Sequence, residues 1–474
     1  MLKYTGHPLV DVGMATIAAF VGKRDPIQLE KADLDKVADY IERQYTSKPL
    51  QGFIHGAVFP NSGYTNPGIK TNRKEYFGPV LYAYRDQLEE SAEPCVVCSA
   101  LSTQRIARDY FPLLTGRGVI NFYPGGDSGL SICGECLLSV QAYPLGSGGF
   151  MLVVHSDNDE LTYHFASEFL RDNRQAVQLA QMAGDKKLLR ARFSYRTLLV
   201  DTLLKADLMQ RERREDEQLF SITAYHVSNS GQSPSLDIYH LPLQSVGFLR
   251  DMHRADYHQE WNAIVNRAWE VAPKTKHRDK DAKPFQPRRN WLYEDLFDLP
   301  DNAPRFLRTY FLRTALHYAQ ARGKTDPRVD YSLQNEANLV SWKITECFLR
   351  RIMYMDKERI EQIRTMGDQL AEYVSSQNDR RFFREFFVEQ RYGYFRTSLI
   401  KANLAHVKQG HPPIITFDPY IEVFEEGDGL AQSGWRLARD LVLIRMVERL
   451  YEQGWLGNNV DAIPEQVEEE SELA

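Results

Sequence analysis

The chain has 474 residues, of which 43% are hydrophobic and 26% charged, and its formal net charge is −6. This length exceeds a single compact core and the apolar content is too high for a disordered protein, so we expect two or three folded domains. The acidic balance excludes a uniformly basic nucleic-acid coat but permits local basic surfaces. No apolar run reaches the roughly 20 residues of a membrane span. Asp11 also interrupts the N-terminal run that is similar to a signal peptide, so we expect a soluble, cytoplasmic chain.

Residues 1–165 are expected to form an N-terminal α+β domain, because short apolar runs alternate with Gly- and Pro-rich turns. Apolar residues at helical spacing predict helices over 29–45 and about 159–190. Two β-rich runs around an Asn/Ser/Gly/Pro loop predict a β-hairpin at 219–243. We assign 166–300 to a middle region that contains this hairpin and a basic, Pro-rich loop at 273–290, which cannot bury a core.

From residue 301 onward the pattern favours long helices joined by short polar segments, which predicts an all-α helical bundle over 301–460. The segments with helical spacing are 305–324, 335–355, 357–376, 380–404 and 435–453. An acidic tail follows at 461–474. Residues 303–410 carry 19 Lys/Arg against 12 Asp/Glu, and 411–474 carry 4 against 14. A basic block in an acidic chain is typical of a protein that touches a phosphate backbone at selected places, although solvated helix faces give the same counts.

Four of the five cysteines form two C-x2-C pairs, Cys95 with Cys98 and Cys133 with Cys136. A two-residue spacer lets one tight turn aim both sulfurs at one ion, so two such turns predict a tetrahedral S4 site for Zn²⁺. The protein would fill all four positions, which makes the predicted site structural. Two redox pairs or a coincidental spacing are the alternatives, but the residues before each pair fit metal-binding turns better than the strand and helix of a redox motif. Cys347 lies in an apolar helical segment and is expected in the core.

Several segments are similar to enzyme motifs without completing one. GGDSG at 125–129 is similar to the nucleophile segment of trypsin-like proteases, but no supporting histidine signature is present and a Gly-rich turn is the better interpretation. PCVVC at 94–98 lacks the upstream H-x-E of zinc deaminases. The acids of HSDNDE at 155–160 suit either Mg²⁺ or a solvated turn. The chain is therefore not expected to be an enzyme.

The opening YTGHPLVDVGMATIAAF, the phrase FPNSGYTNP at 59–67 and the two C-x2-C pairs closely resemble the CXXC–CXXC family of CRISPR-associated proteins. These proteins are large subunits of type I-B Cascade effector complexes, which act in antiviral defence. The resemblance covers residues 1–150 by motif and the helical C-terminal third by architecture. It implies a subunit that recognises the protospacer-adjacent motif (PAM) on duplex DNA, helps open the duplex and stabilises the R-loop, while the guide RNA reads the sequence.

The resemblance also implies a set of partners. These are crRNA, target double-stranded DNA, its displaced single strand, the backbone, 5′-handle-binding and small subunits of Cascade, and a helicase-nuclease or transposition adaptor. In such systems the C-terminal part is often also made alone as the small subunit, from an internal start. Met353, Met355 and Met366 are candidate starts, or else core methionines.

A PAM reader needs polar side chains on a loop that can approach base edges, and the loop at 61–74 has this composition. Its candidate DNA contacts are Asn61, Ser62, Tyr64, Asn66, Lys70, Asn72, Arg73 and Lys74. The alternative is that the two earlier asparagines, Asn61 and Asn66, only satisfy turn backbones.

Candidate contacts to the nucleic-acid backbone come from the basic loop and from basic residues of the helical region. They are Lys274, Lys276, Arg278, Lys280, Lys283, Arg288, Arg289, Arg350, Arg351, Arg380, Arg384 and Arg391. The last three share one stripe if their helix continues unbroken to Gly393. The phenylalanines between them belong to the core or, where exposed, stack an unpaired base: Phe382, Phe383, Phe386 and Phe387. A solvated linker is the other interpretation of the loop.

Two further functions stay open from the sequence. One is a zinc-containing, metal-dependent nuclease that uses the acids at 155–160. The other is a purely structural scaffold of a ribonucleoprotein.

Overall fold

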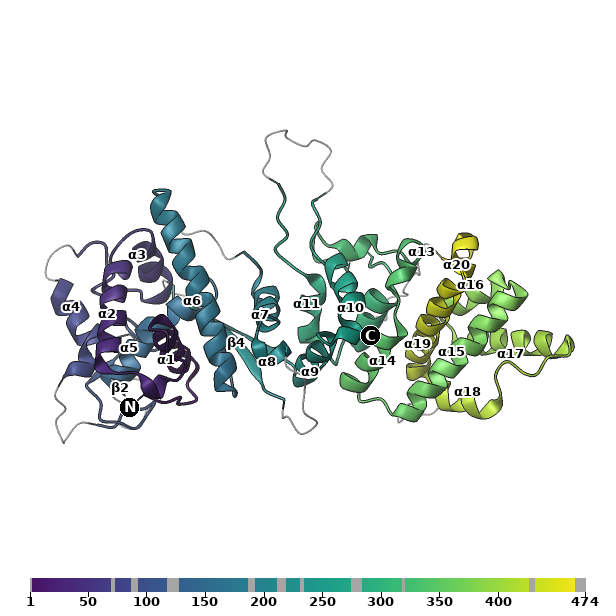
Figure 1. The fold of residues 1–474 in the computed structure, drawn as a ribbon, viewed down its shortest axis with the longest axis horizontal. Helices are drawn as coiled ribbons and strands as arrows, with labels where there is room; N and C mark the ends of the chain where they lie inside the picture. Colours follow the sequence, from purple (N-terminus) through teal and green to yellow (C-terminus); the bar gives the residue numbers. More distant parts are fainter. Residues whose placement is uncertain are drawn as a thin grey trace. The chain divides into compact units, whose positions relative to one another are not determined.

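The chain divides into two compact units, Met1–Leu243 and Gln244–Ala474. The computed structural model (Figure 1) describes residues 2–69, 73–86, 93–116, 128–185, 192–210, 219–230, 234–273, 284–317, 320–425 and 431–464. The boundary between the two units, after Leu243, lies inside the predicted middle region. The predicted hairpin therefore belongs to the first unit and the basic loop to the second. The architecture is mixed α and β, with helices and small sheets in the first unit and a helical second unit.

The described residues of the first unit form two small antiparallel sheets together with helices. The strands are β1 (Gln104–Ile106), β2 (Leu130–Ile132), β3 (Leu152–Ser156), β4 (Ile222–Ser228) and β5 (Ser235–Leu241). The helices are α1 (Pro8–Phe20), α2 (Lys31–Tyr45), α3 (Leu50–Phe53), α4 (Arg73–Leu81), α5 (Gly134–Ala142), α6 (Asp159–Met182), α7 (Tyr195–Leu203) and α8 (Asp207–Gln210).

The predicted hairpin at 219–243 is confirmed as β4 and β5, which pair antiparallel with Tyr225 opposite Ile238. A third strand, β3, pairs on the other side of β4, with Val153 opposite Tyr225. The helix predicted over 29–45 is confirmed as α2, and the helix predicted over about 159–190 is confirmed as α6, which ends at Met182. α6 begins where the side chain of Asn158 accepts a hydrogen bond from the Leu161 amide at 3.2 Å, which satisfies one of the free amides of its first turn.

The core of the first unit forms around α1, which contacts α5 and α6. The close approach of α1 to α5 requires a glycine, because a Cβ atom at Gly13 would lie 1.9 Å from the backbone oxygen of Ser139. Any side chain at this position would therefore push the two helices apart.

Asn229, at the end of β4, is a buried polar residue that joins three segments of the first unit. Its Nδ2 donates to the backbone oxygens of Val58 at 3.0 Å and Arg108 at 3.3 Å. Its Oδ1 accepts from Arg108 Nε at 2.8 Å, and its amide donates to Ala57 O at 2.8 Å.

Replacing Asn229 by alanine is expected to lower the free energy of unfolding by about 2 kcal/mol, because buried backbone acceptors lose their donor. Chemical denaturation of the full chain measures this change. The control is Ser230→Ala, since Ser230 is exposed. Equal stabilities of the two variants would contradict the structural role of Asn229.

The second unit is built from helices, and its described residues contain no paired strand apart from a single bridge between Trp269 and Asn290. Its helices are α9 (Leu243–Met252), α10 (Ala255–Arg267), α11 (Trp291–Asp295), α12 (Ala303–Phe306), α13 (Leu333–Glu336), α14 (Trp342–Arg351), α15 (Lys357–Gln377), α16 (Arg380–Val388), α17 (Tyr392–Lys408), α18 (Phe417–Phe424), α19 (Ala431–Glu452) and α20 (Trp455–Asn458).

Two of the predicted long helices are confirmed, and the others are shorter than predicted. α15 and α19 run through the predicted segments 357–376 and 435–453. The helix predicted at 305–324 is wrong beyond Phe311, because the chain turns at Arg313, which has a φ of 58°. In the segment 335–355 the long helix is α14, and it begins only after Ser341, whose Oγ accepts from the Ile344 amide at 3.3 Å.

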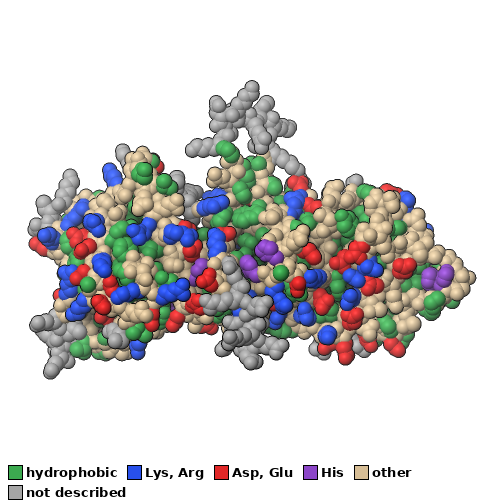
Figure 2. Space-filling view, viewed as in Figure 1, with side chains coloured by type: hydrophobic (Ala, Val, Ile, Leu, Met, Phe, Trp, Pro, Cys, Tyr) green, Lys and Arg blue, Asp and Glu red, His purple; other side chains and the backbone are tan. Residues whose placement is uncertain are grey.

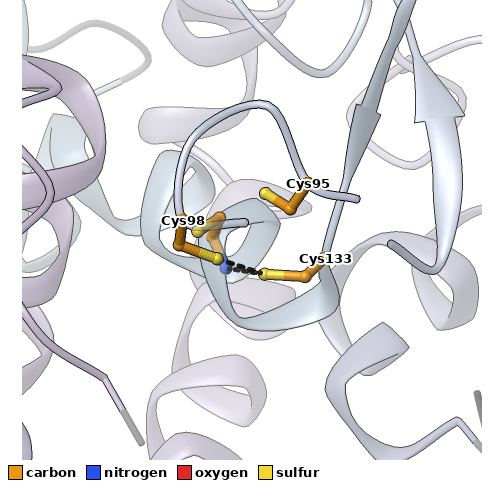
Figure 3. A group of neighbouring side chains, drawn as sticks. Cys95, Cys98 and Cys133 are labelled. Atoms are coloured by element: carbon orange, nitrogen blue, oxygen red, sulfur yellow. Dashed lines mark hydrogen bonds between the residues drawn. The ribbon is translucent and has the colours of Figure 1, made fainter. Parts of the chain in front are cut away.

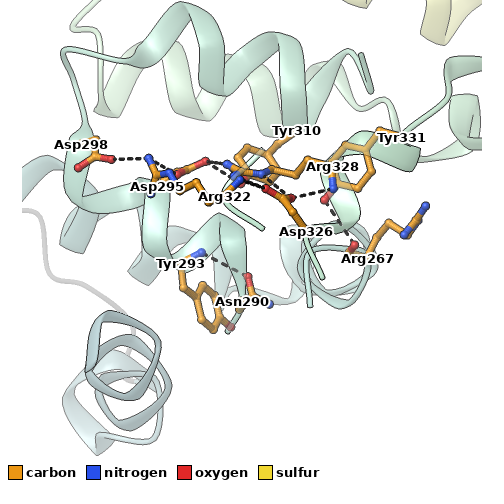
Figure 4. Close-up of polar contacts among 10 residues, drawn as sticks. All are labelled: Arg267, Asn290, Tyr293, Asp295, Asp298, Tyr310, Arg322, Asp326, Arg328 and Tyr331. Atoms are coloured by element: carbon orange, nitrogen blue, oxygen red, sulfur yellow. Dashed lines mark hydrogen bonds and ion pairs between the residues drawn. The ribbon is translucent and has the colours of Figure 1, made fainter. Parts of the chain in front are cut away.

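The turn after Phe311 buries the cation of Arg313, whose guanidinium contacts the carboxylate of Glu336 at 2.5 Å. A second buried cation, Arg328, lies nearby between Asp295 and Asp326 (Figure 4). Its Nη2 lies 2.7 Å from Asp326, and its guanidinium stacks over the ring of Trp291 at 4.7 Å. Each buried cation needs a carboxylate partner. The segment 305–324 therefore ends its helix early, although its apolar spacing is helical, and both arginines lie beside carboxylates.

Across the residues that the structure describes, no helix combines the length and the apolar character needed to cross a lipid bilayer.

Candidate metal centre and nucleic-acid contacts

The first C-x2-C pair lies in a tight turn closed by a bridge between Pro94 and Leu101. The Cys95 amide donates to Ala100 O at 2.6 Å and the Ser99 amide to Cys95 O at 2.9 Å. Ser99 adopts a φ of 63°, which lets the chain reverse directly after Cys98. This backbone bonding points both sulfurs of the pair to one side of the turn.

The second pair lies where a strand meets a helix. Cys133 directly follows β2 and caps the N-terminus of α5, and its Sγ accepts from the Cys136 amide at 3.4 Å. The sequence-based argument that neither pair has a strand before it and a helix after it is therefore wrong for this pair. The Val96 amide donates to Ser131 O at 3.0 Å and so ties the first turn to β2, beside the second pair.

The two turns bring all four thiols into one cluster (Figure 3). The sulfurs of Cys95, Cys98, Cys133 and Cys136 all lie within 4.8 Å of one another, and none is in a disulfide. A tetrahedral Zn²⁺ site with Zn–S bonds of about 2.3 Å has sulfurs roughly 3.8 Å apart, so the cluster fits zinc with little movement. Three of the four cysteines are buried and Cys98 is partly exposed.

The electrostatics of the cluster also fit a cation. Hydrogen bonds from Cys133 and Cys136 lower the pKa of the Cys95 thiol. Hydrogen bonding to Cys133 and Cys95, together with burial, raises the pKa of Cys136. The buried thiolates therefore repel one another, and a divalent cation removes this conflict when all four ligands deprotonate. The four residues present fit a closed structural zinc site with no position left for water or substrate.

The three sequence phrases that carry the family resemblance meet on α5. The opening phrase forms α1, which contacts α5 at Gly13, and the second C-x2-C pair forms the first turn of α5. From the phrase at 59–67, Tyr64 donates its hydroxyl to Gln141 Oε1 of α5 at 2.7 Å. The three phrases are thus parts of one packed element.

The opening phrase is organised by Asp11, a buried carboxylate on α1. Its oxygens accept from the amides of Thr5 at 2.7 Å and Gly6 at 2.8 Å and lie 3.2 Å from His155 Nε2. Burial alone raises the pKa of Asp11, but the hydrogen bonds from His155, Thr5 and Gly6 outweigh it and hold the pKa below its ordinary value.

Asp11 is expected to make the stability of the chain depend on pH. The pKa of Asp11 is lower in the folded chain than in the unfolded chain. The ionised carboxylate therefore stabilises the fold at pH values above the unfolded-state pKa near 3.8, and this stabilisation is lost as the pH falls through the folded-state pKa. Asp11→Asn should therefore cost about 3 kcal/mol at pH 7, and the difference from the natural chain should shrink below pH 4. Denaturation at a series of pH values checks this, with Asp172→Asn at an exposed site as control. A difference that is constant with pH would contradict it.

The loop at 61–74 contains both exposed and buried candidates. Asn61 and Lys74 are exposed, and Asn66 Oδ1 accepts from the Gly68 amide at 2.8 Å, so the turn-forming interpretation holds for Asn66. Arg73 donates to Ile69 O at 2.7 Å. Two candidates, Lys70 and Asn72, lie outside the described residues.

Ser62 and Tyr64 are wrong as DNA contacts in this structure, because both side chains are enclosed in the core. Some residues of this loop are buried and build it, whereas others are exposed on its surface. Composition alone does not distinguish the two kinds.

Of the basic-loop candidates, Lys274, Lys276, Arg278, Lys280 and Lys283 lie outside the described residues, while Arg288 and Arg289 are exposed. The predicted stripe of Arg380, Arg384 and Arg391 is wrong, because the helix ends at Val388 and a new one begins at Tyr392.

The basic candidates of the helical region are exposed or partly exposed, and several have acidic neighbours. Arg380 lies 3.0 Å from Asp461, and Arg391 lies 3.7 Å from Glu389 and stacks over Tyr394 at 4.2 Å. Arg351 lies 2.5 Å from Asp251, and Arg350 is 3.9 Å from Glu346. Basic and acidic side chains are interleaved over the face shown in Figure 2.

All four phenylalanines of the basic helical segment are buried, which confirms their core interpretation: Phe382, Phe383, Phe386 and Phe387. Rings enclosed in the core in this way are not available to stack an unpaired base. Cys347 is likewise buried, and burial raises the pKa of its thiol to about 12.

Of the acids at 155–160, Asp157 binds the backbone, and Asp159 and Glu160 lie in the first turn of α6. Asp157 Oδ1 accepts from the Ser221 amide at 2.8 Å, and Asn158 caps α6. Within the described part of the chain, the only group of three or more metal-binding side chains is the cysteine cluster. The interpretation of this segment as a turn is therefore the one the geometry supports.

Sequence reasoning missed Asp11 and Asn229 as organising residues. An isolated acid inside an apolar helical run is a signal for the first, because a buried carboxylate must be hydrogen-bonded. No sequence signal marks the second, whose partners lie on distant segments.

No protein-family model matches the chain, and neither does any curated protein or solved structure.

Proposed function

We propose that this chain is the non-catalytic large subunit of a crRNA-guided type I-B Cascade complex. In this role it recognises the PAM on duplex DNA, helps open the duplex and stabilises the R-loop. It also helps to recruit a helicase-nuclease or a transposition adaptor. The helical segment 301–460 would act as the small-subunit-like bundle.

One observation carries this proposal: the opening phrase, the phrase at 59–67 and the two C-x2-C pairs converge on α5. Short motifs at unrelated places in a fold can each match a family by chance. Chance matches are less expected for motifs that pack against one another. The packing therefore supports treating them as one signature. The closed cysteine site fits the same role, because a site filled by four protein ligands stabilises a fold and leaves no place for substrate.

The proposal places PAM contacts on the exposed part of the 61–74 loop. Asn61 is exposed on the loop that the buried Tyr64 fixes to α5, and Lys74 is exposed in the first turn of α4. An amide side chain can read base edges and a lysine can contact phosphate. Exposed side chains of these two types are suited to a short motif in a groove.

The test is a gel-shift series with the chain reconstituted together with crRNA and the partner subunits. The variant Asn61→Ala/Lys74→Ala should weaken binding to PAM-bearing duplex by at least tenfold. The control Lys205→Ala removes an exposed lysine outside this segment and should bind as the natural chain does. Equal binding by all three proteins would overturn the placement of the PAM contacts on this loop.

The nuclease alternative predicts a different result. It requires Mg²⁺-dependent strand cutting that is lost in Asp157→Ala and Asp159→Ala. The backbone hydrogen bond of Asp157 speaks against this role. The structural-scaffold alternative predicts that neutralising the basic loop has no consequence for DNA binding.

A further inference from the structure

Helix α17 in the second unit has apolar side chains on two opposite faces. Phe395, Leu399 and Ala402 are buried against the rest of the unit. On the outer face, the side chains of Ile400, Leu404 and Val407 are 48%, 54% and 45% exposed. These three positions are spaced i, i+4 and i+7, so they form one continuous stripe along the helix. We call them the α17 stripe.

The stripe is unusual for a surface that faces only water. Soluble proteins expose single apolar residues at scattered positions, whereas a contiguous aliphatic row with polar edges marks an interaction surface. The spacing is also that of the ridges by which one helix packs against another. The geometry therefore indicates a helical partner.

The charges of α17 restrict the kind of partner. The helix carries Arg396, Lys401 and Lys408 and contains no Asp or Glu between Tyr392 and Lys408. Lys401 and Lys408 lie three residues before and four residues after Leu404, so they flank the stripe along one edge. A partner with acidic side chains beside its apolar row would complement this edge.

Two other occupants fit less well. A second copy of α17 would set its basic edge against an identical basic edge, which costs free energy. Nucleic acid bases stack on aromatic rings and arginine planes, whereas the stripe is aliphatic. We propose that the α17 stripe binds an amphipathic helix with acidic flanks from a partner protein. This inference rests on α17 alone and does not depend on the proposed function.

The test uses the full chain and a labelled synthetic helix with a leucine row flanked by glutamates, followed by fluorescence anisotropy. The triple variant Ile400→Ser/Leu404→Ser/Val407→Ser should bind this helix at least tenfold more weakly than the natural chain. Because all three positions are exposed, the variant should keep its thermal unfolding temperature. The double variant Lys401→Glu/Lys408→Glu should instead prefer a matched helix in which lysines replace the glutamates.

Four results would overturn the proposal. One is equal binding of the glutamate helix by the natural chain and the triple variant. A second is tighter binding of oligothymidylate or of phosphatidylserine vesicles that the triple variant loses. A third is self-association, measured by sedimentation, that the triple variant abolishes. The fourth is a tenfold gain in peptide affinity when the chain ends at Pro464, which would mean that its own acidic end occupies the stripe.

Discussion

Replacing Cys136 by serine is expected to abolish zinc binding and to destabilise the first unit strongly. The variant should lose the one zinc ion per chain that we expect in the natural protein. Zinc binding to a four-thiolate site contributes on the order of 10 kcal/mol to folding in small zinc domains. The larger core around α1 and α5 retains part of the fold, so we expect a loss of roughly 5 kcal/mol or more. Zinc content and thermal unfolding of the purified chain measure the two effects.

The matched control is Cys347→Ser, which changes a buried thiol in the second unit. This variant should keep its zinc. A chelator added to the natural chain should reproduce the Cys136→Ser result and expose four reactive thiols. If the natural chain binds no zinc and its stability is the same with and without chelator, the metal centre is wrong.

Replacing Arg328 by methionine is expected to be the most damaging single change in the second unit. Arg328 is buried, donates from Nε to Asp326 at 2.9 Å and pairs with Asp295, which also accepts from the Tyr310 hydroxyl at 2.8 Å. Removing the cation leaves the buried carboxylate of Asp326 without its counter-charge and leaves Asp295 only the partly exposed Arg322 at 3.4 Å, which costs about 3–5 kcal/mol. Burial alone raises the pKa of Asp326, and the hydrogen bonds and charge of Arg328 hold it below its ordinary value.

Hydrogen exchange of the segment around α11 to α13 measures this loss as faster opening. The control is Arg322→Met, since Arg322 is partly exposed and lies 3.4 Å from Asp295 and Asp298. With a partly exposed cation at this distance, each of these pairs contributes less than about 1 kcal/mol. Equal exchange rates in the two variants would contradict the assignment of Arg328 as the cation that holds this region together.

The elements with a strong local signal were predictable from the sequence. α15 has apolar residues at helical spacing and a cap at Asp356, whose side chain accepts from the Glu358 amide at 2.7 Å. The β4–β5 hairpin has β-rich runs around a turn-forming loop, and the C-x2-C spacing alone indicated that the cysteines converge. In these cases local preference and tertiary structure agree.

The break between α16 and α17 was not predictable, because distant residues cause it. Arg439 of α19 donates to the backbone oxygen of Glu389, and Arg436 donates to Gln390 O at 3.1 Å. These bonds satisfy carbonyl groups that leave the helix. The helical pattern of 380–404 continues through the break, so periodicity gives no sign of it.

The candidate site was predictable only in part, because some of its residues are marked by local sequence and others depend on the fold. The cysteines are identified by type and spacing, which do not depend on the rest of the fold. The nucleic-acid contacts depend on exposure, and sequence did not separate the exposed Asn61 from the buried Tyr64. Met366 shows the same ambiguity, since it is buried on α15 while its use as an internal start stays a prediction.

The most direct test of the account is equilibrium binding of the reconstituted crRNA complex to target duplexes that carry every sequence of a short flanking motif. A few motifs should bind at least a hundredfold more tightly than the rest. Omitting this chain from the complex should remove the preference. Binding that is indifferent to the motif, or a preference that persists without the chain, would contradict its role as the PAM-recognising subunit.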